Sequence, residues 1–426
     1  MPLRMTGHGR SSTRRSVRLL LAARTARSVA QGVLAVDFAL YLRSLHWSGA
    51  AIGSVLAGGL LFAVAVTISA GIASDRVGRK RFLLGYDAVY VLACIAAVAT
   101  TQPTILGAAA IIGAFGRGAN GAAGPFGAIE RAWLTQGLDP GTRSQVIALN
   151  TTLGFLGMAL GAACAILPGL MAAATPAADA YRPIFAIALA AALLSLACIA
   201  LAEDRHVALV QSADVPAERA VRHKENRNLR MLALANFLQG TGIGLTGPLV
   251  SYWFALRFGI GPRHIAPLIA TGFLLAAISS HLTTPLSRRY GLMQVIVVLR
   301  LAALTLLFAF PFAPNLATAI GIFLLRNTLN RATNGPRSAI TASLVRNQRL
   351  GLAGIVSSVS RQVPRSVGPV VAGAMFDSGM LVAPFVVGAM FQAGYLWLYR
   401  RSFHSQDPLR PVRESTRDPQ HEAVPS

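Results

Sequence analysis

The chain has 426 residues, of which 54% are hydrophobic and only 13% are charged. Because soluble globular proteins carry about 25% charged residues, this composition excludes an ordinary water-soluble enzyme and a disordered chain. The formal net charge is +23, but the arginines lie in short tracts between apolar stretches, as in a polytopic membrane protein. We therefore expect a lipid bilayer, and not a nucleic acid, as the partner of this surface. The three cysteines lie inside apolar runs, so neither a disulfide framework nor a metal or other cofactor is expected.

A membrane-spanning helix needs about 20 mostly apolar residues, and this criterion predicts twelve spans. In chain order their approximate ranges are 18–42, 49–72, 82–100, 104–129, 145–170, 182–202, 230–256, 264–284, 291–311, 315–338, 350–376 and 381–399. The first run is too long for the core of a signal peptide, so we expect a retained helix. Turn-forming residues separate several spans, at Gln102-Pro103, Asp139-Pro140-Gly141, Gly261-Pro262 and Pro314-Asn315. The predicted fold class is an all-α polytopic membrane protein.

The basic residues alternate between the two sides of the predicted membrane. The tail 1–17, the tract Arg76–Arg81, the stretch 203–229 and the tail 400–426 are rich in them. The alternate connections hold little beyond Arg43, Arg182, Arg257 and Arg263. Since Lys and Arg collect on the cytoplasmic side, both termini are predicted to be cytoplasmic, with the chain in the inner or plasma membrane.

The stretch 203–229 is the longest polar insert and separates two sets of six spans. We interpret it as a flexible linker between an N-terminal half, 18–202, and a C-terminal half, 230–399, with a disordered tail at 400–426. The two halves align with few identical residues. Gly78 falls on Gly291, which is an identity, whereas Asp87 falls on Arg300. Two such halves with a binding site between them are a known plan for transporters.

The connection between the second and third spans contains a motif. It reads Gly71-Ile-Ala-Ser-Asp75-Arg76-Val-Gly78-Arg79-Lys80-Arg81. A glycine lets helices approach closely or permits a tight turn, and the carboxylate can accept charge-assisted hydrogen bonds while the basic residues reach neighbouring helix ends. The motif resembles the G-x-x-x-D-[RK]-x-G-[RK]-[RK] signature of the major facilitator superfamily.

This resemblance implies a fold of two pseudo-symmetric six-helix bundles and a gate at the motif. The gate would comprise Gly71, Asp75, Arg76, Gly78, Arg79, Lys80, Glu130 and Arg143. Within it Glu130 resembles the gate carboxylate of the family, and we expect it to pair with the Asp75–Arg79 loop or with Arg143. The second copy of the motif is degenerate, because Arg288 replaces the aspartate.

A second motif lies in the fourth span. Arg117-Gly-Ala-Asn120-Gly121-Ala-Ala-Gly124 resembles the R-x-x-[QN]-G-x-x-A pattern of the same family, which implies a role of Arg117 in proton coupling. An arginine halfway along a span is also a functional candidate on physical grounds; the alternative is a structural ion pair with a buried carboxylate. The antiporter signature expected in the fifth span is not clean, since Ala162 occupies its proline position.

Polar stripes occur on several spans at helical spacing. Asn327, Asn330, Arg331 and Asn334 share one face, as do Arg27 and Gln31. Because lipid cannot host such faces, we expect them to line a water-accessible cavity or to contact each other. The predicted substrate cavity comprises Arg27, Gln31, Asn120, Gln239, Asn327, Asn330, Arg331, Asn334 and Arg361. For any single arginine the alternative is snorkelling to the interface. Asp37 is the carboxylate best placed for proton exchange, with a structural role as its alternative.

The chain lacks the sequence motifs of ATP, zinc or serine hydrolase chemistry, so we do not expect an enzyme. The predicted function is secondary active transport of a small organic solute by alternating access, as proton-coupled efflux, by a monomer. Because arginines outnumber carboxylates within the spans, an organic-anion transporter working by symport or exchange is the alternative. A further alternative is a membrane sensor that binds a ligand without transporting it.

Overall fold

The computed structural model describes residues 10–116, 127–136, 138–171, 175–176, 178–203, 219–346 and 349–403. Within these ranges it describes the backbone alone at 10–13, 70–77, 128, 140, 219–220, 280–282, 284, 288 and 350–351. Its helices are α1 (Arg10–Ser44), α2 (Gly49–Val77), α3 (Arg79–Ala99), α4 (Pro103–Gly113), α5 (Gly127–Leu134), α6 (Pro140–Cys164), α7 (Leu167–Met171), α8 (Arg182–Leu201), α9 (Arg219–Thr246), α10 (Val250–Phe258), α11 (Pro262–Tyr290), α12 (Leu292–Ala309), α13 (Leu316–Ala332), α14 (Asn334–Ser343), α15 (Leu350–Asp377) and α16 (Ala383–Phe403), with the short 3₁₀ helices η3 (Asp179–Tyr181) and η4 (Phe310–Phe312).

Seven helical segments of the described chain are long and apolar enough to cross a membrane. They are Arg14–Ser44, Gly49–Ser69, Arg79–Ala99, Gly141–Met171, Asp179–Leu201, Pro262–Ser279 and Leu292–Phe312. Each coincides with one of the twelve predicted spans. The other five predicted spans are mainly helical in their described residues, with breaks such as that at 247–249, but their helices do not meet these criteria of length and hydropathy.

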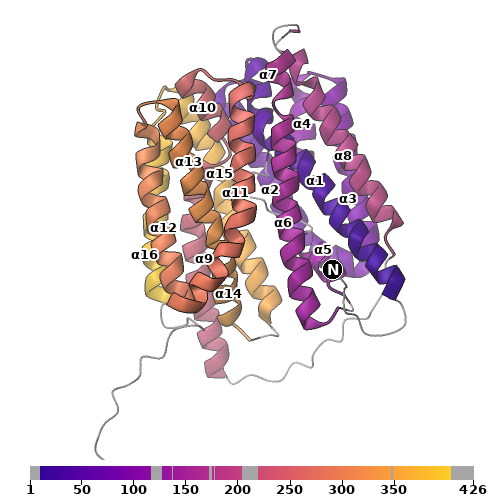
Figure 1. Cartoon of the computed structure of the whole chain (residues 1–426), viewed down its shortest axis with the longest axis vertical. Coiled ribbons are helices and arrows are strands. Elements are labelled where there is room, and N and C mark those ends of the chain that lie inside the picture. Colours follow the sequence, from indigo (N-terminus) through magenta and orange to yellow (C-terminus); the bar gives the residue numbers. More distant parts are fainter. Residues whose placement is uncertain are drawn as a thin grey trace, which may run out of the picture.

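Helices in equivalent places of the two halves have equivalent neighbours. The first helix of the chain, α1, packs against α6 and α8, just as α9 packs against α15 and α16. Similarly, α3 packs against α4 and α8, while α12 packs against α13 and α16. In Figure 1 the helices up to α8 lie mainly on one side of the molecule and those from α9 onward on the other. The predicted arrangement of two pseudo-symmetric helical bundles is therefore confirmed.

The turns at Gly78 and Gly291 repeat the same backbone conformation. Gly78, between α2 and α3, has φ 92° and ψ 141°, and Gly291, between α11 and α12, has φ 84° and ψ 154°. Only glycine adopts such positive φ values readily. The alignment of these two residues in the sequence therefore reflects a repeated structural element.

Helix starts follow the predicted turn residues. Asp139 accepts a hydrogen bond from the backbone N–H of Thr142 at 3.0 Å, and Asn315 caps α13 through Thr318 at 2.9 Å. Both are N-caps, in which a side-chain oxygen satisfies a helix N–H that has no partner within the helix. Proline follows Asp139 at the first position of α6, where its missing N–H costs nothing.

The two halves contact each other along α2 and α15 and along α6 and α11. At the start of α2, the carboxylate of Asp377 accepts hydrogen bonds from the backbone N–H groups of Gly49 at 2.7 Å and Ala50 at 2.8 Å. A residue of the second half thus caps a helix of the first. Gly53 lies against the backbone carbonyl of Pro369, so close that a Cβ atom would clash.

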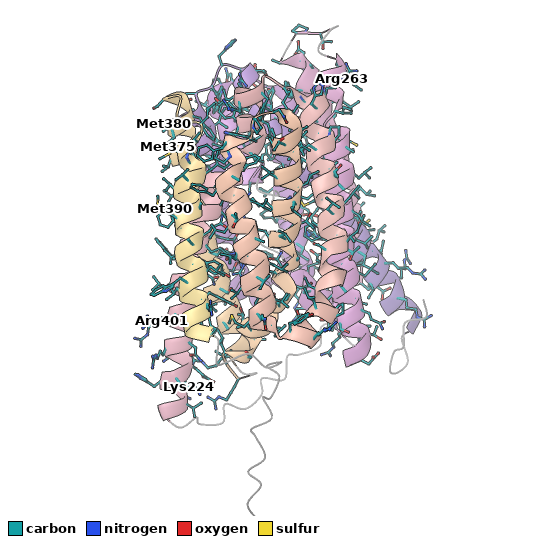
Figure 2. The ribbon with its side chains drawn as sticks, turned by 60° about the vertical axis from the view of Figure 1, so that its left-hand side comes forward. Lys224, Arg263, Met375, Met380, Met390 and Arg401 are labelled. Carbon is teal, nitrogen blue, oxygen red and sulfur yellow. The ribbon has the colours of Figure 1, made fainter. Side chains whose placement is uncertain are left out.

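These contacts lie at one end of the bundle, which we call the α7–α10 end. Figure 2 shows Arg263 at this end, where its backbone packs against Gly169 of α7. Lys224 and Arg401 lie at the opposite, α5–α14 end (Figure 2).

Large apolar side chains face outward along the spans: Leu92, Met390 and Trp397 are each more than 60% exposed. Such a surface suits lipid contact and not water.

Two predicted boundaries are wrong. Helix α9 begins at Arg219, inside the stretch 203–229 that we predicted to be a linker. Its early turns are held by Glu225, which is buried and pairs with Arg346 at 2.9 Å and Arg349 at 2.8 Å. The predicted continuous span 315–338 is broken between α13 and α14, because Pro336 has no N–H to continue the helical hydrogen bonds.

The Glu225 ion pairs predict a pH dependence of stability. Hydrogen bonds from Arg346 and Arg349 hold the pKa of Glu225 at about 2, below its ordinary value of 4.5. Because the pKa is lower in the folded state, the pairs stabilise the protein fully above the unfolded value, and this stability is lost as the pH falls toward 2. Between about pH 5 and pH 3, the thermal-unfolding midpoint should fall further in the wild type than in Glu225→Gln. Equal falls in the two proteins would mean that the pairs contribute nothing.

Candidate functional site

A buried charge cluster joins four helices of the first half. Arg27 of α1 pairs through Nη2 with Glu130 Oε2 of α5 at 2.6 Å, and its Nη1 lies 3.7 Å from Asp87 Oδ1 of α3. Asp87 Oδ2 accepts a hydrogen bond from the Ser195 hydroxyl of α8 at 2.6 Å. All four side chains are buried. We call Arg27, Asp87, Glu130 and Ser195 the Arg27 cluster.

The Arg27 cluster contains one guanidinium and two carboxylates. Such groups are stable inside a protein only when they are paired and hydrogen-bonded, because burial removes the water that would otherwise solvate them. The cluster therefore ties α1 to the helices around it through charge. A change in the charge of either carboxylate would alter the interactions that hold α1.

The partner of Glu130 differs from the expected one. We expected a pair with the Asp75–Arg79 loop or with Arg143, but Glu130 faces inward from α5 and binds Arg27. Arg143 is exposed and donates instead to the backbone carbonyl of Leu138 at 2.8 Å. Arg27, placed in the substrate cavity by its spacing, is only 6% exposed.

The gate motif is described only in part. The side chains of Asp75 and Arg76, and the surroundings of Gly71, lie outside the described residues, as do Arg117 and Asn120. Lys80 Nζ donates to the backbone carbonyls of Ala200 and Ala202, both at 2.7 Å. Lysine at this place satisfies carbonyls that α8 leaves without a partner at its C-terminus. Arg79 is half-buried.

Two more polar residues of α1 are buried. Asp37 is fully buried, and neither carboxylate oxygen has a hydrogen-bond partner within the described residues. Gln31 is 6% exposed, and its carbonyl oxygen likewise finds no partner in the described part of the chain. Asp37 follows Arg27 by ten residues, which is about 15 Å along the helix. Helix α1 thus carries two separate polar sites at different depths.

The second half contains a group of arginines on four helices. We call it the arginine cluster; it comprises Arg300 of α12, Arg326 and Arg331 of α13, Arg337 of α14, and Arg361 and Arg365 of α15. All are buried except Arg361, which is partly exposed. The sequence has no Asp or Glu between Glu225 and Asp377. The membrane-spanning part of the second half therefore supplies no carboxylate to these arginines.

Neutral groups surround the arginines. Arg300 donates to the Thr333 hydroxyl at 2.9 Å and to Asn330 Oδ1 at 3.1 Å. Arg331 Nε donates to Asn327 Oδ1 at 3.1 Å. Of the predicted residues, Asn330 thus binds Arg300 of α12, and Asn327 binds Arg331 within α13.

Aromatic rings and amides hold the deeper members of the cluster. Arg337 donates to Asn236 Oδ1 at 3.2 Å and lies over the rings of Tyr395 and Tyr399, 5.3 and 5.9 Å from their centroids. Arg326 reaches the Thr246 hydroxyl at 3.4 Å. Cation–π contacts of this kind stabilise a guanidinium without neutralising it.

One arginine reaches the boundary between the halves. Arg331 lies over Phe155 of α6 at 5.2 Å and over Phe273 of α11 at 5.0 Å. These rings come from opposite halves, so Arg331 lies where the halves meet.

Gln239, another predicted cavity residue, is fully buried on α9. Asn334 is exposed beyond the break after α13, so the structure does not unite it with the others.

Arg337 was not predicted as a site residue, and Arg300 appeared only as the counterpart of Asp87 in the repeat. The signal that could have identified both is the long stretch without acidic residues around them. Arginines within such a stretch cannot be explained by ion pairs along the chain.

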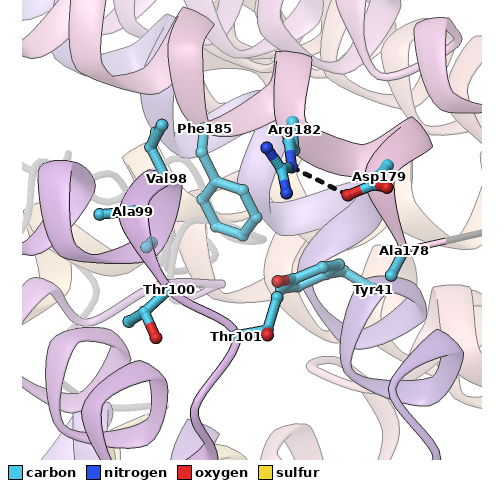
Figure 3. A pocket seen from close by; sticks show the side chains of 10 residues that line it. Tyr41, Val98, Ala99, Thr100, Thr101, Ala178, Asp179, Arg182 and Phe185 are labelled. Atoms are coloured by element: carbon cyan, nitrogen blue, oxygen red, sulfur yellow. Dashed lines mark ion pairs between the residues drawn. The ribbon is translucent and has the colours of Figure 1, made fainter.

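A small cavity of about 190 Å³ lies elsewhere, at the α7–α10 end of the first half (Figure 3). It is lined by Tyr41, Phe185 and the exposed ion pair between Asp179 and Arg182, whose side chains are 2.9 Å apart. All the residues that line it belong to the first half. It is separate from both charge clusters, and we do not regard it as the transport site.

The chain belongs to the Major Facilitator Superfamily, whose family profile matches residues 20–369. It is therefore a multi-pass membrane protein of a transporter family and not an enzyme family. An uncharacterised membrane protein of Saccharomyces cerevisiae is 22% identical, in a match that covers 86% of this chain and 89% of the relative.

Solved transporter structures share the fold at low sequence identity. A bacterial homologue of the human lysosomal transporter Spinster, inward-facing and unoccupied, is 14% identical with a TM-score of 0.69, covering 94% of this chain and 99% of its own. The nucleoside transporter NupG is 15% identical with a TM-score of 0.68, covering 91% and 99%. The xylose transporter XylE from E. coli, inward open, is 14% identical with a TM-score of 0.68, covering 92% and 96%.

Proposed function

We propose that this protein is a monomeric secondary transporter that moves a small organic solute out of the cell by alternating access, driven by protons. The observation that carries the proposal is the Arg27 cluster, in which buried carboxylates surround an arginine on α1. In a low-dielectric interior, a proton added to Asp87 or Glu130 removes the attraction of that carboxylate to Arg27 and leaves only the other one. The position of α1 relative to α3 and α5 then depends on protonation.

Asp37 is the second group in this proposal. A buried carboxyl group without hydrogen-bond partners is costly when it is charged, so it is suited to carry a proton in one state of the transport cycle. Asp37 lies nearer the α7–α10 end of α1 than Arg27 does. We propose that protons reach the first half through Asp37, and that Arg117 takes part in coupling as its motif implies.

The contacts between the halves suit one end state of alternating access. Because Lys and Arg collect on the cytoplasmic side of membranes, we propose that the α5–α14 end, with Lys224 and Arg401, faces the cytoplasm. The Asp377 cap and the contact of Gly53 with Pro369 then close the outer end of the protein. We propose that the structure is inward-facing and that the residues of the motif from Gly71 to Lys80, together with Glu130 and Arg143, gate the cytoplasmic end. The two halves, 18–202 and 230–399, would rock as units.

Everted membrane vesicles with a proton gradient, reported by a fluorescent amine, test the transport proposal. Lipophilic cations and then organic anions are added, and release of protons is expected for one of these two panels. Asp37→Asn should remove this response while the amount of protein in the membrane stays unchanged. A normal proton response in Asp37→Asn would exclude Asp37 from the proton path. No response of the wild type to either panel would contradict proton-coupled efflux of these solute classes.

A further inference from the structure

The arginines of the second half form one continuous group of like charges. Arg300 and Arg337 lie over the same ring, that of Tyr395, at 5.7 and 5.3 Å from its centroid. Arg326 and Arg331 share helix α13, which packs against the helix of Arg300. Asn236 of α9 links Arg337 to α15, because it accepts a hydrogen bond from Arg337 and donates one to Ser357, one turn before Arg361. The guanidinium groups of Arg300, Arg326, Arg337 and Arg361 lie in a membrane-spanning stretch that has no Asp or Glu, and like charges in such surroundings repel each other strongly.

The first half shows how the same framework is neutralised. There Asp87 of α3 and Glu130 of α5 surround Arg27 of α1. Arg300 aligns with Asp87, and Arg337 of α14 contacts α9 in the way that Glu130 of α5 contacts α1. Where the first half supplies carboxylates, the second half supplies arginines. The negative charge for the second half must therefore come from outside its own residues.

Buried polar atoms near the cluster also have no partner within the described residues. Both amide atoms of Gln239, the Nε2 atom of Gln392 and the Nε atom of Arg326 make no hydrogen bond there. Gln239 is fully buried and Gln392 is 6% exposed. Buried polar groups without a hydrogen-bond partner are unfavourable, so this place favours a ligand with polar groups of its own.

We propose that the arginine cluster binds an oxyanion carried by the transported solute, which makes the solute an organic anion such as a polycarboxylate or a phosphate ester. The guanidinium fork matches carboxylate and phosphate oxygens in geometry as well as in charge. This assignment rests on the proposed transport function. It deepens that function by giving the second half the task of binding the solute, while the carboxylates of the first half carry protons.

The members of the cluster have different tasks. Arg361 is partly exposed and Arg331 lies at the boundary between the halves, so these two contact the anion directly. Arg300, Arg326 and Arg337 lie deeper among neutral groups. They raise the local positive potential and thereby strengthen anion binding from a distance. Gln239 would bond to a polar group of the solute.

The first test measures binding to the purified full-length protein in detergent, in a zwitterionic buffer with ionic strength matched by potassium chloride. The probes are phosphate, sulfate, citrate and, as a cation of the opposite class, tetraphenylphosphonium. We expect phosphate and citrate to raise the thermal-unfolding midpoint and the cation to leave it unchanged. Arg361→Gln should weaken the apparent affinity for citrate by about 10- to 100-fold, as expected for the loss of charged hydrogen bonds.

Two further variants separate anion recognition from general effects. Arg361→Lys keeps the charge but loses the planar fork, so its affinity for citrate should lie between those of the wild type and Arg361→Gln. Arg257→Gln, on the exposed surface of α10, removes an arginine outside the cluster and should bind citrate like the wild type. Equal loss of affinity in Arg257→Gln and Arg361→Gln would overturn the assigned site.

The second test distinguishes a transported anion from a resident inorganic ion. Proteoliposomes loaded with unlabelled citrate or glycerol phosphate are given the same labelled anion outside, and counterflow is measured. Uptake that Arg361→Gln lacks would support the proposal. Binding of phosphate without counterflow of either organic anion would overturn it in favour of a bound inorganic ion. A response to lipophilic cations alone in the vesicle assay would likewise overturn it, yet leave the proposed proton-driven transport standing.

Discussion

Replacing Arg27 by methionine is expected to abolish transport and to lower the free energy of unfolding by about 3–5 kcal/mol. The substitution leaves Asp87 and Glu130 buried next to each other without their positive partner. Buried charges that lose a partner destabilise a protein far more than the intact pair stabilises it. The stability is measured by thermal or denaturant unfolding of the purified protein, and transport in the vesicle assay.

A compensated variant separates the structural from the transport role of the cluster. Arg27→Met combined with Asp87→Asn and Glu130→Gln removes all three charges, so most of the lost stability should return. Transport should not return, because no group of the cluster could then bind or release a proton. Recovery of proton-driven flux in this triple variant would mean that the cluster serves only to hold the helices together.

Asp377→Ala is expected to shift the protein away from the state in which the α7–α10 end is closed. The carboxylate caps the first N–H groups of α2 from the other half. Since loss of an N-cap costs about 0.5–2 kcal/mol, the ratio of closed to open molecules should fall about 2- to 30-fold. The readout is the rate at which a membrane-impermeant maleimide labels a single cysteine introduced at Val370, beside Gly53, in a chain whose native cysteines are replaced by serine.

Asp179→Ala is the matched control for this experiment. Asp179 also lies at the α7–α10 end, but its ion pair with Arg182 is within one half, and the two side chains are 45% and 67% exposed. Exposed pairs contribute at most about 1 kcal/mol, and this one does not join the halves. Its loss should leave the labelling rate unchanged. Faster labelling in Asp179→Ala and not in Asp377→Ala would refute the role of the cap.

The helical framework could be predicted from the sequence because its causes are local. Apolar runs of membrane length and turn residues such as Pro103, Pro140 and Pro262 act on their own segments. The equivalence of Gly78 and Gly291 could be predicted for the same reason, since a tight turn demands glycine wherever it occurs. The start of α9 at Arg219 could not be predicted in this way. Glu225 in its early turns is held by Arg346 and Arg349, which lie more than a hundred residues further along the chain.

The site was predictable only in its parts. The polarity of Arg27, Asn327 and Arg331 identified them as residues that lipid cannot host. Their partners depend on helix packing: Glu130 is 103 residues from Arg27 in the chain, and no pattern of spacing relates the two. The break after α13 also removed Asn334 from its predicted face, although Pro336 nearby was a warning of it.

The arginine cluster has a consequence for how the protein responds to membrane voltage. A charge that crosses the whole membrane changes its energy by about 2.3 kcal/mol per 100 mV. If the six guanidinium groups move by a tenth of the field when the halves rock, the voltage contributes about 1.4 kcal/mol per 100 mV. An oxyanion bound among them would cancel part of this moving charge. Pre-steady-state currents on a supported membrane should therefore be larger for the empty protein than in saturating citrate, and equal currents would show that the cluster does not move through the field.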